Sequence, residues 1–199
     1  MTSTQSPLPQ IVLGSTSRYR AELLRRLIPD FEQCAPGVDE APLADEAPVD
    51  RALRLAIAKA RAAASGWHDA LVIGSDQVAE LDDLVLDKPG TTEHAQAQLA
   101  ASSGREVRFH TALCLLDTRD GRQQTHVDHT RVRFRELGAA EIARYVEREQ
   151  PLDCAGSFKC EGLGISLFES IDNNDPSALI GLPLIALARL LREAGITLP

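Results

Sequence analysis

The stretch Leu71-Val72-Ile73-Gly74-Ser75-Asp76-Gln77-Val78 places a single carboxylate after an apolar run. The apolar residues predict a buried strand, and the small residues Gly74 and Ser75 predict a turn at its end. Asp76 is then expected where the strand meets solvent, a position from which an acid can take part in chemistry. A second stretch of similar design, residues 11–20, leads a strand into a hydroxyl-rich loop and a basic helix start. Such a layout is typical of a phosphate site.

Composition limits the class of protein and its partners. A chain of 199 residues suits one domain of ordinary size with a substantial core. Residues 1–9 lack the features of a signal peptide and are predicted to form a flexible lead-in, so that residues 10–199 form the single domain. No apolar run reaches the length of a membrane span, which favours a soluble, cytoplasmic protein. The net charge of −8 argues against binding to nucleic acid.

Strand and helix signals alternate along the chain, which predicts an α/β or α+β fold built on a mixed sheet. Strands are expected at residues 11–13, 71–73, 107–116, 130–134 and 165–168, with hairpins turning at residues 82–83 and 120–121. Helices are expected at residues 18–27, 50–64, 92–103, 140–149 and 183–194. Asp50 is the expected N-cap of the second helix, and residues 169–176 are expected to form a polar segment.

The loop after the first strand carries hydroxyl and basic side chains. Ser15 and Ser17, with the backbone amides around them, can bind a phosphate, and Arg20 adds a bidentate donor within the first helical turn. The alternative is that one serine only caps the helix and that Arg20 is solvated. The loop lacks the Gly-Lys-Ser/Thr ending of a P-loop, so the chain is not a Walker NTPase.

Charged residues elsewhere suggest a metal and further phosphate contacts. Asp39 and Glu40 lie in an acidic loop, and together with Asp76 they could hold an oxygen-seeking ion such as magnesium. Lys59 lies about 200° around its predicted helix from the core residue Ile57 and therefore faces solvent or a cleft. Two loop lysines could reach a phosphate or remain solvated, Lys88 and Lys159.

Histidines and cysteines do not suggest a zinc centre or a covalent mechanism. The histidines at positions 68, 94, 110, 126 and 129 lack the ligand spacing of a zinc protease, and no Ser-His-Asp order recommends itself. The four cysteines lack the close pairing of a zinc site and are expected to be structural thiols. The remaining chemistry is metal-assisted attack of water on a phosphoanhydride, with a carboxylate that holds the metal or takes the proton.

Seven motifs together resemble one enzyme family. They are Leu13 to Arg20, Val38-Asp39-Glu40, Ala58-Lys59-Ala60, Ile73 to Val78, Asp87-Lys88-Pro89, Cys154 to Phe158 and Ile180 to Pro183. Their order along nearly the whole chain resembles the Maf family of nucleoside triphosphate pyrophosphatases. The resemblance implies a Maf/ITPase-like fold, with a twisted mixed sheet and flanking helices in two lobes around a central cleft. It also implies cleavage between the α and β phosphates with a divalent metal, expected to be magnesium, with manganese and cobalt as alternatives.

By position, the resemblance assigns roles to six residues. Asp76 matches the catalytic acid of the family, described as a proton acceptor, and is also a candidate metal ligand. Glu40 matches an acidic residue near the metal. Four polar or basic positions line the phosphate side: Ser15, Arg20, Lys59 and Lys88. The implied partner is a small-molecule nucleoside triphosphate, and the oligomeric state stays open, although homodimers are common for such folds.

Three further positions resemble the YceF-like branch, which hydrolyses 7-methyl-GTP. They are Tyr19, Gln77 and Glu161. Methylation at N7 makes guanine cationic, so the Tyr19 ring could contribute a cation–π energy of about 0.5 to 2 kcal/mol. Glu161 could accept hydrogen bonds from N1 and N2 of the same base. The alternatives are that Tyr19 packs on the neighbouring lobe and that Glu161 is a solvated loop acid.

Two functional alternatives accompany the house-cleaning hydrolysis of 7-methyl-GTP. The first is the same reaction on dTTP, UTP or a broad set of nucleotides, which the aromatic Tyr19 in place of a family arginine disfavours. The second is a nucleotide-sensing regulator, which would bind a triphosphate without needing a poised acid. An RNA-binding module is a third reading, and the acidic charge of the chain opposes it.

Overall fold

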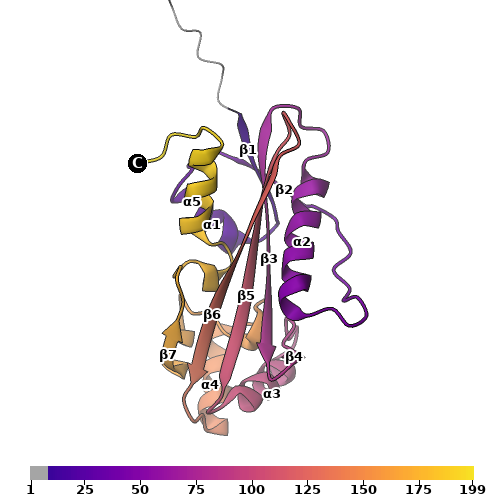
Figure 1. The fold of residues 1–199 in the computed structure, drawn as a ribbon. Helices are drawn as coiled ribbons and strands as arrows, with labels where there is room; N and C mark the ends of the chain where they lie inside the picture. Colours follow the sequence, from indigo (N-terminus) through magenta and orange to yellow (C-terminus); the bar gives the residue numbers. More distant parts are fainter. Residues whose placement is uncertain (1–8) are drawn as a thin grey trace, which may run out of the picture.

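Residues 9–199, the part of the chain that the computed structural model describes, form a mixed sheet of seven strands (Figure 1). The strands are β1 (Gln10–Gly14), β2 (Glu32–Cys34), β3 (Ala70–Leu81), β4 (Leu84–Val85), β5 (Glu106–Asp117), β6 (Gln123–Phe134) and β7 (Phe168–Asp172). Their order is β2-β1-β3-β5-β6-β7, and β4 pairs with the end of β3. The pairs β1–β2 and β1–β3 are parallel and the others antiparallel, as the predicted mixed sheet requires. Apart from Pro9, the predicted lead-in lies outside the described residues.

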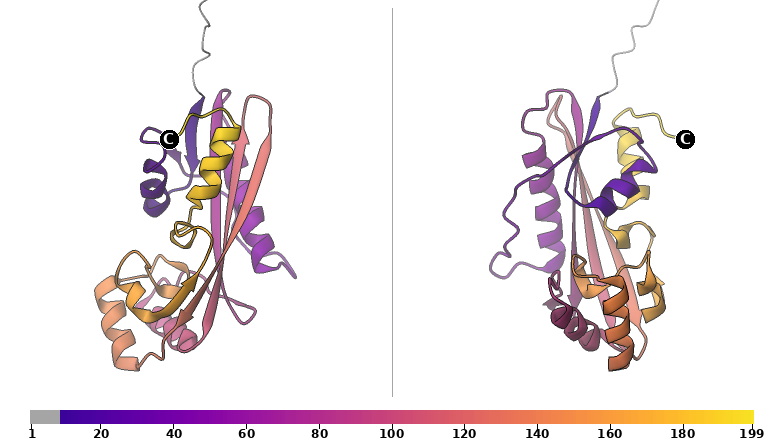
Figure 2. Two further views of the ribbon diagram at one scale, coloured as in Figure 1. Left: turned by 60° about the vertical axis from the view of Figure 1, so that its left-hand side comes forward. Right: turned by 180° about the vertical axis from the view of Figure 1, so that it is seen from behind.

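Within the described residues, five helices pack on the faces and at one end of the sheet. They are α1 (Arg18–Arg25), α2 (Pro48–Ala63), α3 (Thr92–Ser102), α4 (Ala139–Glu149) and α5 (Leu184–Glu193). In the upper half of Figure 1, α1 and α5 cover one face of the sheet and α2 covers the other. Helices α3 and α4 lie at the opposite end, beside β7 (Figure 2). Because the long strands β3, β5 and β6 run through both halves, the two lobes share one sheet, and the predicted architecture is confirmed.

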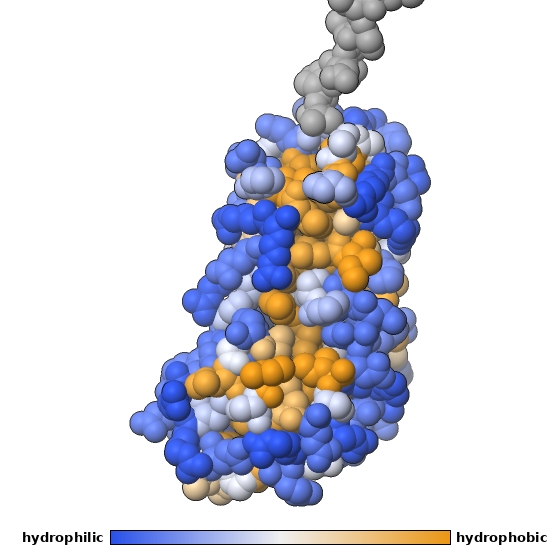
Figure 3. Space-filling view, turned by 90° about the vertical axis from the view of Figure 1, so that its left-hand side faces the viewer, coloured by the Kyte–Doolittle hydropathy of each residue, from blue (hydrophilic) through white to orange (hydrophobic). Residues whose placement is uncertain are grey.

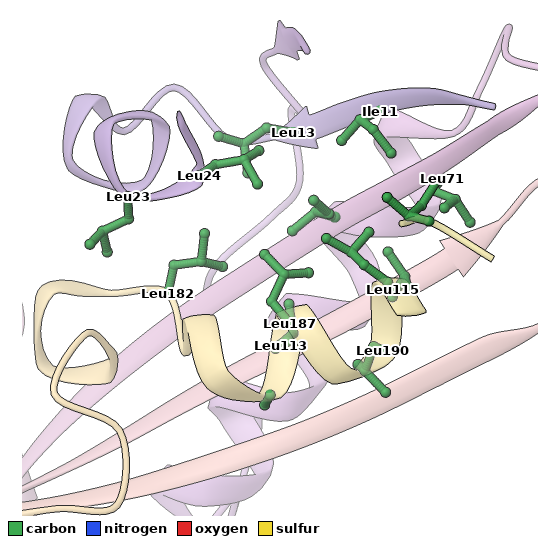
Figure 4. Packing of buried hydrophobic residues seen from close by; sticks show 14 of the residues in the cluster. Ile11, Leu13, Leu23, Leu24, Leu71, Leu113, Leu115, Leu182, Leu187 and Leu190 are labelled. Carbon is green, nitrogen blue, oxygen red and sulfur yellow. The ribbon is translucent and has the colours of Figure 1, made fainter. Parts of the chain in front are cut away.

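Apolar side chains fill the interior of each lobe. In the upper lobe, leucines of β1, β3 and β5 point toward α1 and α5 (Figure 4). In the lower lobe, four phenylalanine rings pack edge to face with centroids 4.8–5.7 Å apart: Phe109, Phe134, Phe158 and Phe168. Burial of each such side chain contributes about 1.5–3 kcal/mol. On the side that carries α5 and β7, apolar residues also form a band at the surface (Figure 3).

Strand β3 does not end where the sequence predicts. Gly74 and Ser75 were expected to form a turn, yet β3 continues through Asp76 to Leu81 and pairs with β5 along that length. The two residues are small for a different reason. A Cβ at Gly74 would collide with the carbonyl oxygen of Ala56 in α2. The Ser75 hydroxyl lies within hydrogen-bond distance of the carbonyls of Ala112 in the neighbouring strand β5 and of Gly181. Small side chains here allow close packing, so the prediction of a turn was wrong.

Two other element boundaries differ from the prediction. Helix α2 begins at Pro48 after the N-cap Ala47, so Asp50 lies in the first turn and is not the N-cap. Proline is favoured at this first position because its missing N–H has no acceptor there. Residues 163–167 form a short 3-10 helix, and the strand predicted at 165–168 is displaced to β7, within the segment expected to be polar. Pairing of β7 with β6 supplies the hydrogen bonds that the local sequence does not specify.

Several sequence predictions are confirmed in detail. The hairpin between β3 and β4 turns at Asp82 and Asp83, whose φ angles of 44° and 66° are those of a type I′ turn. Helix α3 begins at Thr92, as predicted, after the N-cap Thr91, whose side chain accepts a hydrogen bond from the amide of His94. The four cysteines are free thiols. No helix within residues 9–199 combines the length and the apolarity needed to cross a bilayer.

The packing of α2 against β3 predicts a large effect at Gly74. We expect Gly74→Ala to lower the free energy of unfolding by about 3 kcal/mol or more, because backbone atoms of α2 must shift to admit the new methyl group. Gly138→Ala is the matched control, since nothing lies within 4 Å of its added Cβ and its φ of −78° suits alanine. Urea denaturation of both variants measures the difference. Equal stability of the two variants would contradict the close packing.

Candidate active site

A cleft of about 970 Å³ opens between the two lobes. Segments far apart in sequence line it: the loop from β1 to α1, residues 35–38 and 40, one side of α2, the middle of β3, and residues 153–155, 158, 160 and 161. The nine residues that the family resemblance assigned to a site all line it: Ser15, Tyr19, Arg20, Glu40, Lys59, Asp76, Gln77, Lys88 and Glu161. The fold therefore brings these nine positions together, while their roles remain predictions.

A buried lysine lies between two carboxylates in this cleft. The Lys59 Nζ of α2 donates to Asp76 Oδ1 of β3 at 2.6 Å and to Glu40 Oε1 at 2.7 Å. Lys59 and Asp76 are each only 6% exposed, whereas Glu40 is exposed. Burial alone would raise the pKa of Glu40, but the hydrogen bond and charge of Lys59 outweigh it and hold that pKa below its usual value. Lys59 thus faces the cleft, the second of its two predicted environments.

The loop from β1 to α1 is held in place by its own hydroxyls and by Arg20. The Ser15 Oγ accepts hydrogen bonds from the amide of Ser17 at 3.1 Å and from Arg20 Nη1 at 3.4 Å. Ser17 caps α1 by accepting from the amide of Arg20. Arg20 Nε donates to the Gly181 carbonyl at 2.9 Å, so Arg20 is not solvated. Burial lowers the pKa of Arg20, against the opposing charges of Asp76 and Glu40.

The two carboxylates fit a magnesium ion that is shared with a substrate. The carboxylates of Glu40 and Asp76 both contact the Lys59 ammonium, so they lie on either side of a single cation. Among residues 9–199, no cluster of three or more His, Cys, Asp or Glu side chains could hold a metal. Magnesium is commonly bound by one or two carboxylates plus water and phosphate oxygens. Asp39, predicted to join them, is not on the cleft wall, and its Oδ1 accepts from the amide of Ala41.

Tyr19 also lines the cleft, among charged side chains. Its hydroxyl accepts from Arg18 Nη2 at 2.7 Å and donates to Asp153 Oδ2 of the opposite lobe at 3.4 Å. The Arg18 guanidinium lies over its ring, 4.8 Å from the centroid. Burial raises the pKa of Tyr19 to about 12, so the phenol is neutral at physiological pH. Glu161 lines the cleft and is exposed, and its Oε2 accepts from Cys160 Sγ at 3.5 Å.

Gln77 acts on the site through the backbone. Its Nε2 donates to Thr111 Oγ1 at 2.9 Å and to the carbonyls of Ala178 and Leu179 at 3.0 and 3.1 Å. These bonds fix the segment whose Gly181 carbonyl accepts from Arg20. The side chain therefore positions a wall of the cleft, and its predicted part in specificity stays a prediction.

Lys159 does not lie where the sequence suggested. Its Nζ donates to the carbonyls of Glu149 and Gln150, at the end of α4, at 2.8 and 3.2 Å. A cation at this position stabilises the negative end of the helix dipole. Lys159 is absent from the described wall of the cleft, so of its two predicted environments the phosphate contact finds no support in the structure.

Sequence reasoning missed Arg51, which also lines the cleft. Its side chain is 14% exposed, and its Nη2 donates to the Glu40 carbonyl at 3.2 Å and lies 3.4 Å from Asp87 Oδ1. Its Nε is buried and has no hydrogen-bond partner within the described residues. A buried donor without an acceptor costs about 1–3 kcal/mol, which a bound anion would relieve. Helical spacing could have found it, because Arg51, Leu55 and Lys59 recur every four residues on one face of α2.

Comparisons with known proteins agree with this geometry. The chain matches the family described as Maf-like protein over residues 10–194. It is 58% identical to a 7-methyl-GTP pyrophosphatase of Burkholderia thailandensis, over 96% of this chain and 90% of that protein. It is also 58% identical to a 7-methyl-GTP pyrophosphatase of Xanthomonas oryzae pv. oryzae, over 96% of this chain and 100% of that protein. The solved Ham1 protein of Staphylococcus aureus shares the fold, with a TM-score of 0.51 and 16% identity over 94% of this chain and 100% of that chain.

The unpaired Nε of Arg51 predicts a contribution to anion binding. We expect Arg51→Met to weaken binding of diphosphate roughly 10-fold, because a hydrogen bond to a charged group contributes about 1.5–3 kcal/mol. Isothermal titration calorimetry measures the affinity directly. Arg61→Met is the control, since Arg61 lies at the far end of α2 and its Nε donates to Gln123. If the two variants bind diphosphate equally well, Arg51 does not contact the phosphates.

Proposed function

The chain belongs to the Maf-like family, and on that premise we propose that it hydrolyses 7-methyl-GTP to 7-methyl-GMP and diphosphate. The proposal places it in the YceF-like branch, as a house-cleaning enzyme that removes a modified nucleotide. Its support is twofold: the relatives that share 58% of their residues carry that activity in their names, and the cleft holds a buried carboxylate beside several cations. We further propose that it acts in the cytoplasm, where nucleotides are formed.

The observation that carries the proposal is the Lys59 ammonium between Asp76 and Glu40. A triphosphate brings several negative charges into the cleft of a chain that already carries a net charge of −8. Local cations must therefore neutralise it, and Arg20, Arg51 and Lys59 converge on the same wall. When phosphate oxygens replace Asp76 as the ion-pair partner of Lys59, the Asp76 carboxylate becomes available as a base.

In the proposed mechanism, Asp76 accepts a proton from the attacking water. Its Oδ1 is bound to Lys59, and the residue lines the cleft. The water oxygen forms a bond to the α phosphorus, the bond from that phosphorus to the oxygen bridging the α and β phosphates breaks, and diphosphate leaves with the bonding electrons. Lys59, Lys88 and Arg20 neutralise the charge that develops on the leaving group. Glu40 and Asp76 would hold a magnesium ion, or manganese or cobalt in its place. Such an ion would supply polarisation of the phosphate oxygens.

Base recognition is proposed for the Tyr19 end of the cleft. Guanine methylated at N7 is a cation, and a cation positioned over an aromatic face is attracted to it. The Arg18 guanidinium already takes such a position over Tyr19, and the carboxylates of Asp153 and Glu161 lie on the same wall. We propose that the methylated base replaces Arg18 on the ring, while Glu161 accepts from its N1 and N2 donors.

The first test separates an enzyme from a nucleotide sensor. We expect Asp76→Asn to reduce turnover of 7-methyl-GTP about 10²- to 10⁴-fold, the range of a lost general base. Nucleotide affinity should persist, because the Asp76 carboxylate no longer competes with the phosphates for the Lys59 ammonium. Diphosphate release and calorimetric binding measure the two quantities, and Asp83→Asn, in an exposed turn, is the control. Binding without turnover in the unmodified protein would instead support the regulator.

The second test concerns the base. We expect Tyr19→Leu to reduce the preference for 7-methyl-GTP over GTP, measured as a ratio of kcat/KM values, by about 2- to 30-fold, the equivalent of the lost cation–π energy. Tyr19→Phe keeps the ring and should keep the ratio. A panel that includes dTTP, UTP and CTP completes the measurement. Preference of the unmodified protein for dTTP and UTP would reject the assignment to 7-methyl-GTP and retain the reaction.

A further inference from the structure

Two histidines lie opposite each other on the sheet, outside the described cleft wall. His110 of β5 and His129 of β6 are direct partners in the antiparallel register. Their Nδ1 atoms are 2.9 Å apart, and their rings stand at 82° to each other. The residues are 19 positions apart in the chain, so only the pairing of β5 with β6 brings them together. This explains why spacing along the sequence gave no sign of them.

A carboxylate orients one of the two rings. Glu80 of β3 lies 2.8 Å from His110 Nε2, and both side chains are only 13% exposed. An ionised carboxylate accepts a proton but cannot donate one, so Nε2 of His110 carries the hydrogen. The neutral ring then presents the lone pair of Nδ1 toward His129. Carboxylates orient metal-binding histidines in this way, from the nitrogen opposite the metal.

The imidazole of His129 can present a lone pair in the same way as that of His110. His129 is exposed, so its ring can rotate and, as the tautomer with hydrogen on Nε2, direct its own Nδ1 lone pair at the same point. Partial burial, and then the charges of His110 and His126, lower the pKa of His129, which favours the neutral form. Two imidazole nitrogens about 3 Å apart suit a single ion bound to both at about 2.0–2.1 Å.

The surroundings do not repel a cation. Toward one end of the two strands, the neighbours of the histidines on the same face of the sheet are Arg108 on β5 and Arg131 on β6. Arg131 is paired with Asp172, and Arg108 lies 3.6 Å from Glu106. On the other side the neighbours are the uncharged Ala112 and Val127. With Glu80 ionised, the local charge around the two rings therefore does not oppose a bound dication.

We propose that His110 and His129 form a binding site for a divalent transition metal ion of the zinc class, with Glu80 as the positioning carboxylate. Imidazole nitrogen favours zinc, copper and nickel over magnesium, so this site differs in chemistry from the carboxylate pair of the cleft. Since no cluster of three metal-binding side chains occurs within residues 9–199, water completes the coordination. The ion would join β5 to β6 and, through Glu80, to β3.

The thiols near the cleft are partly buried. Burial, with help from Asp153, raises the pKa of Cys154 to about 12, and burial with Glu161 does the same for Cys160. Metals bind the thiolate form, which a raised pKa disfavours.

Titration of the full chain with zinc sulfate tests the site, followed by ¹H–¹⁵N correlation spectra of the histidine rings. We expect the Nδ1 signals of His110 and His129 to shift at one equivalent, while His110 keeps its Nε2–H. Calorimetry should show one zinc site that His129→Ala abolishes and that Glu80→Gln weakens about 10- to 100-fold. His126→Ala is the matched control, because His126 lies on the same strand but on the opposite face.

Three outcomes would overturn the proposal. The first is that the His110 and His129 signals stay unchanged at millimolar zinc, which would leave the pair as an ordinary N–H···N hydrogen bond. The second is zinc affinity that His129→Ala does not alter. The third is a zinc site that persists in His129→Ala and disappears in Glu40→Gln, which places the ion in the cleft. Magnesium-dependent hydrolysis by His129→Ala should equal that of the unmodified protein, so this test and those of the proposed function fail independently.

Discussion

The close contact of α2 with the sheet is the constraint on which the cleft depends. Gly14 of β1 and Gly74 of β3 have no side chain to separate them from the helix, and a Cβ at either would overlap atoms of α2. Only at this short distance can Lys59 reach Asp76 across the interface, with 2.6 Å between nitrogen and oxygen. A charged pair buried this deeply is weak evidence for stability, since desolvation opposes its attraction. Its position at the cleft indicates a functional role.

Charge balance explains why an acidic protein can receive a polyanion. Three of the cations that line the cleft are held by carboxylates or carbonyls: Lys59 by Glu40 and Asp76, Arg20 by Gly181, and Arg51 by Glu40. Each contact preserves the position of the cation without ligand. The phosphate oxygens of a triphosphate then replace the protein groups that accept from these cations, so little reorganisation of the site is required. Preorganisation of this kind reduces the entropy that binding must overcome.

Local patterns in the sequence predicted most helices and the mixed sheet, and the polarity of the loops indicated several cleft residues, among them Ser15, Arg20 and Glu40. The resemblance to a family, and no local pattern, indicated Tyr19, Gln77 and Glu161. The prediction failed where contacts with a segment distant in the sequence determine the local conformation. Gly74 and Ser75 are typical of a turn, yet pairing with β5 and the contact with α2 hold them extended. Similarly, β7 lies where β6 offers a partner. Arg51 shares a helix face with Lys59, but the lack of an acceptor for its Nε is a property of the folded structure alone.

The alternation of side chains along strands lets one sheet serve two sites. On β3, Asp76 faces Lys59 of α2, whereas Gln77 turns to the opposite side and fixes residues 178–179. On β6, His129 meets His110, whereas His126 is three positions away and faces the other layer. A shift of one residue in the register of β3 with β5 would move Thr111 away from Gln77 and Glu80 away from His110. The pairing that orders the wall of the cleft therefore also places the carboxylate against the histidine pair.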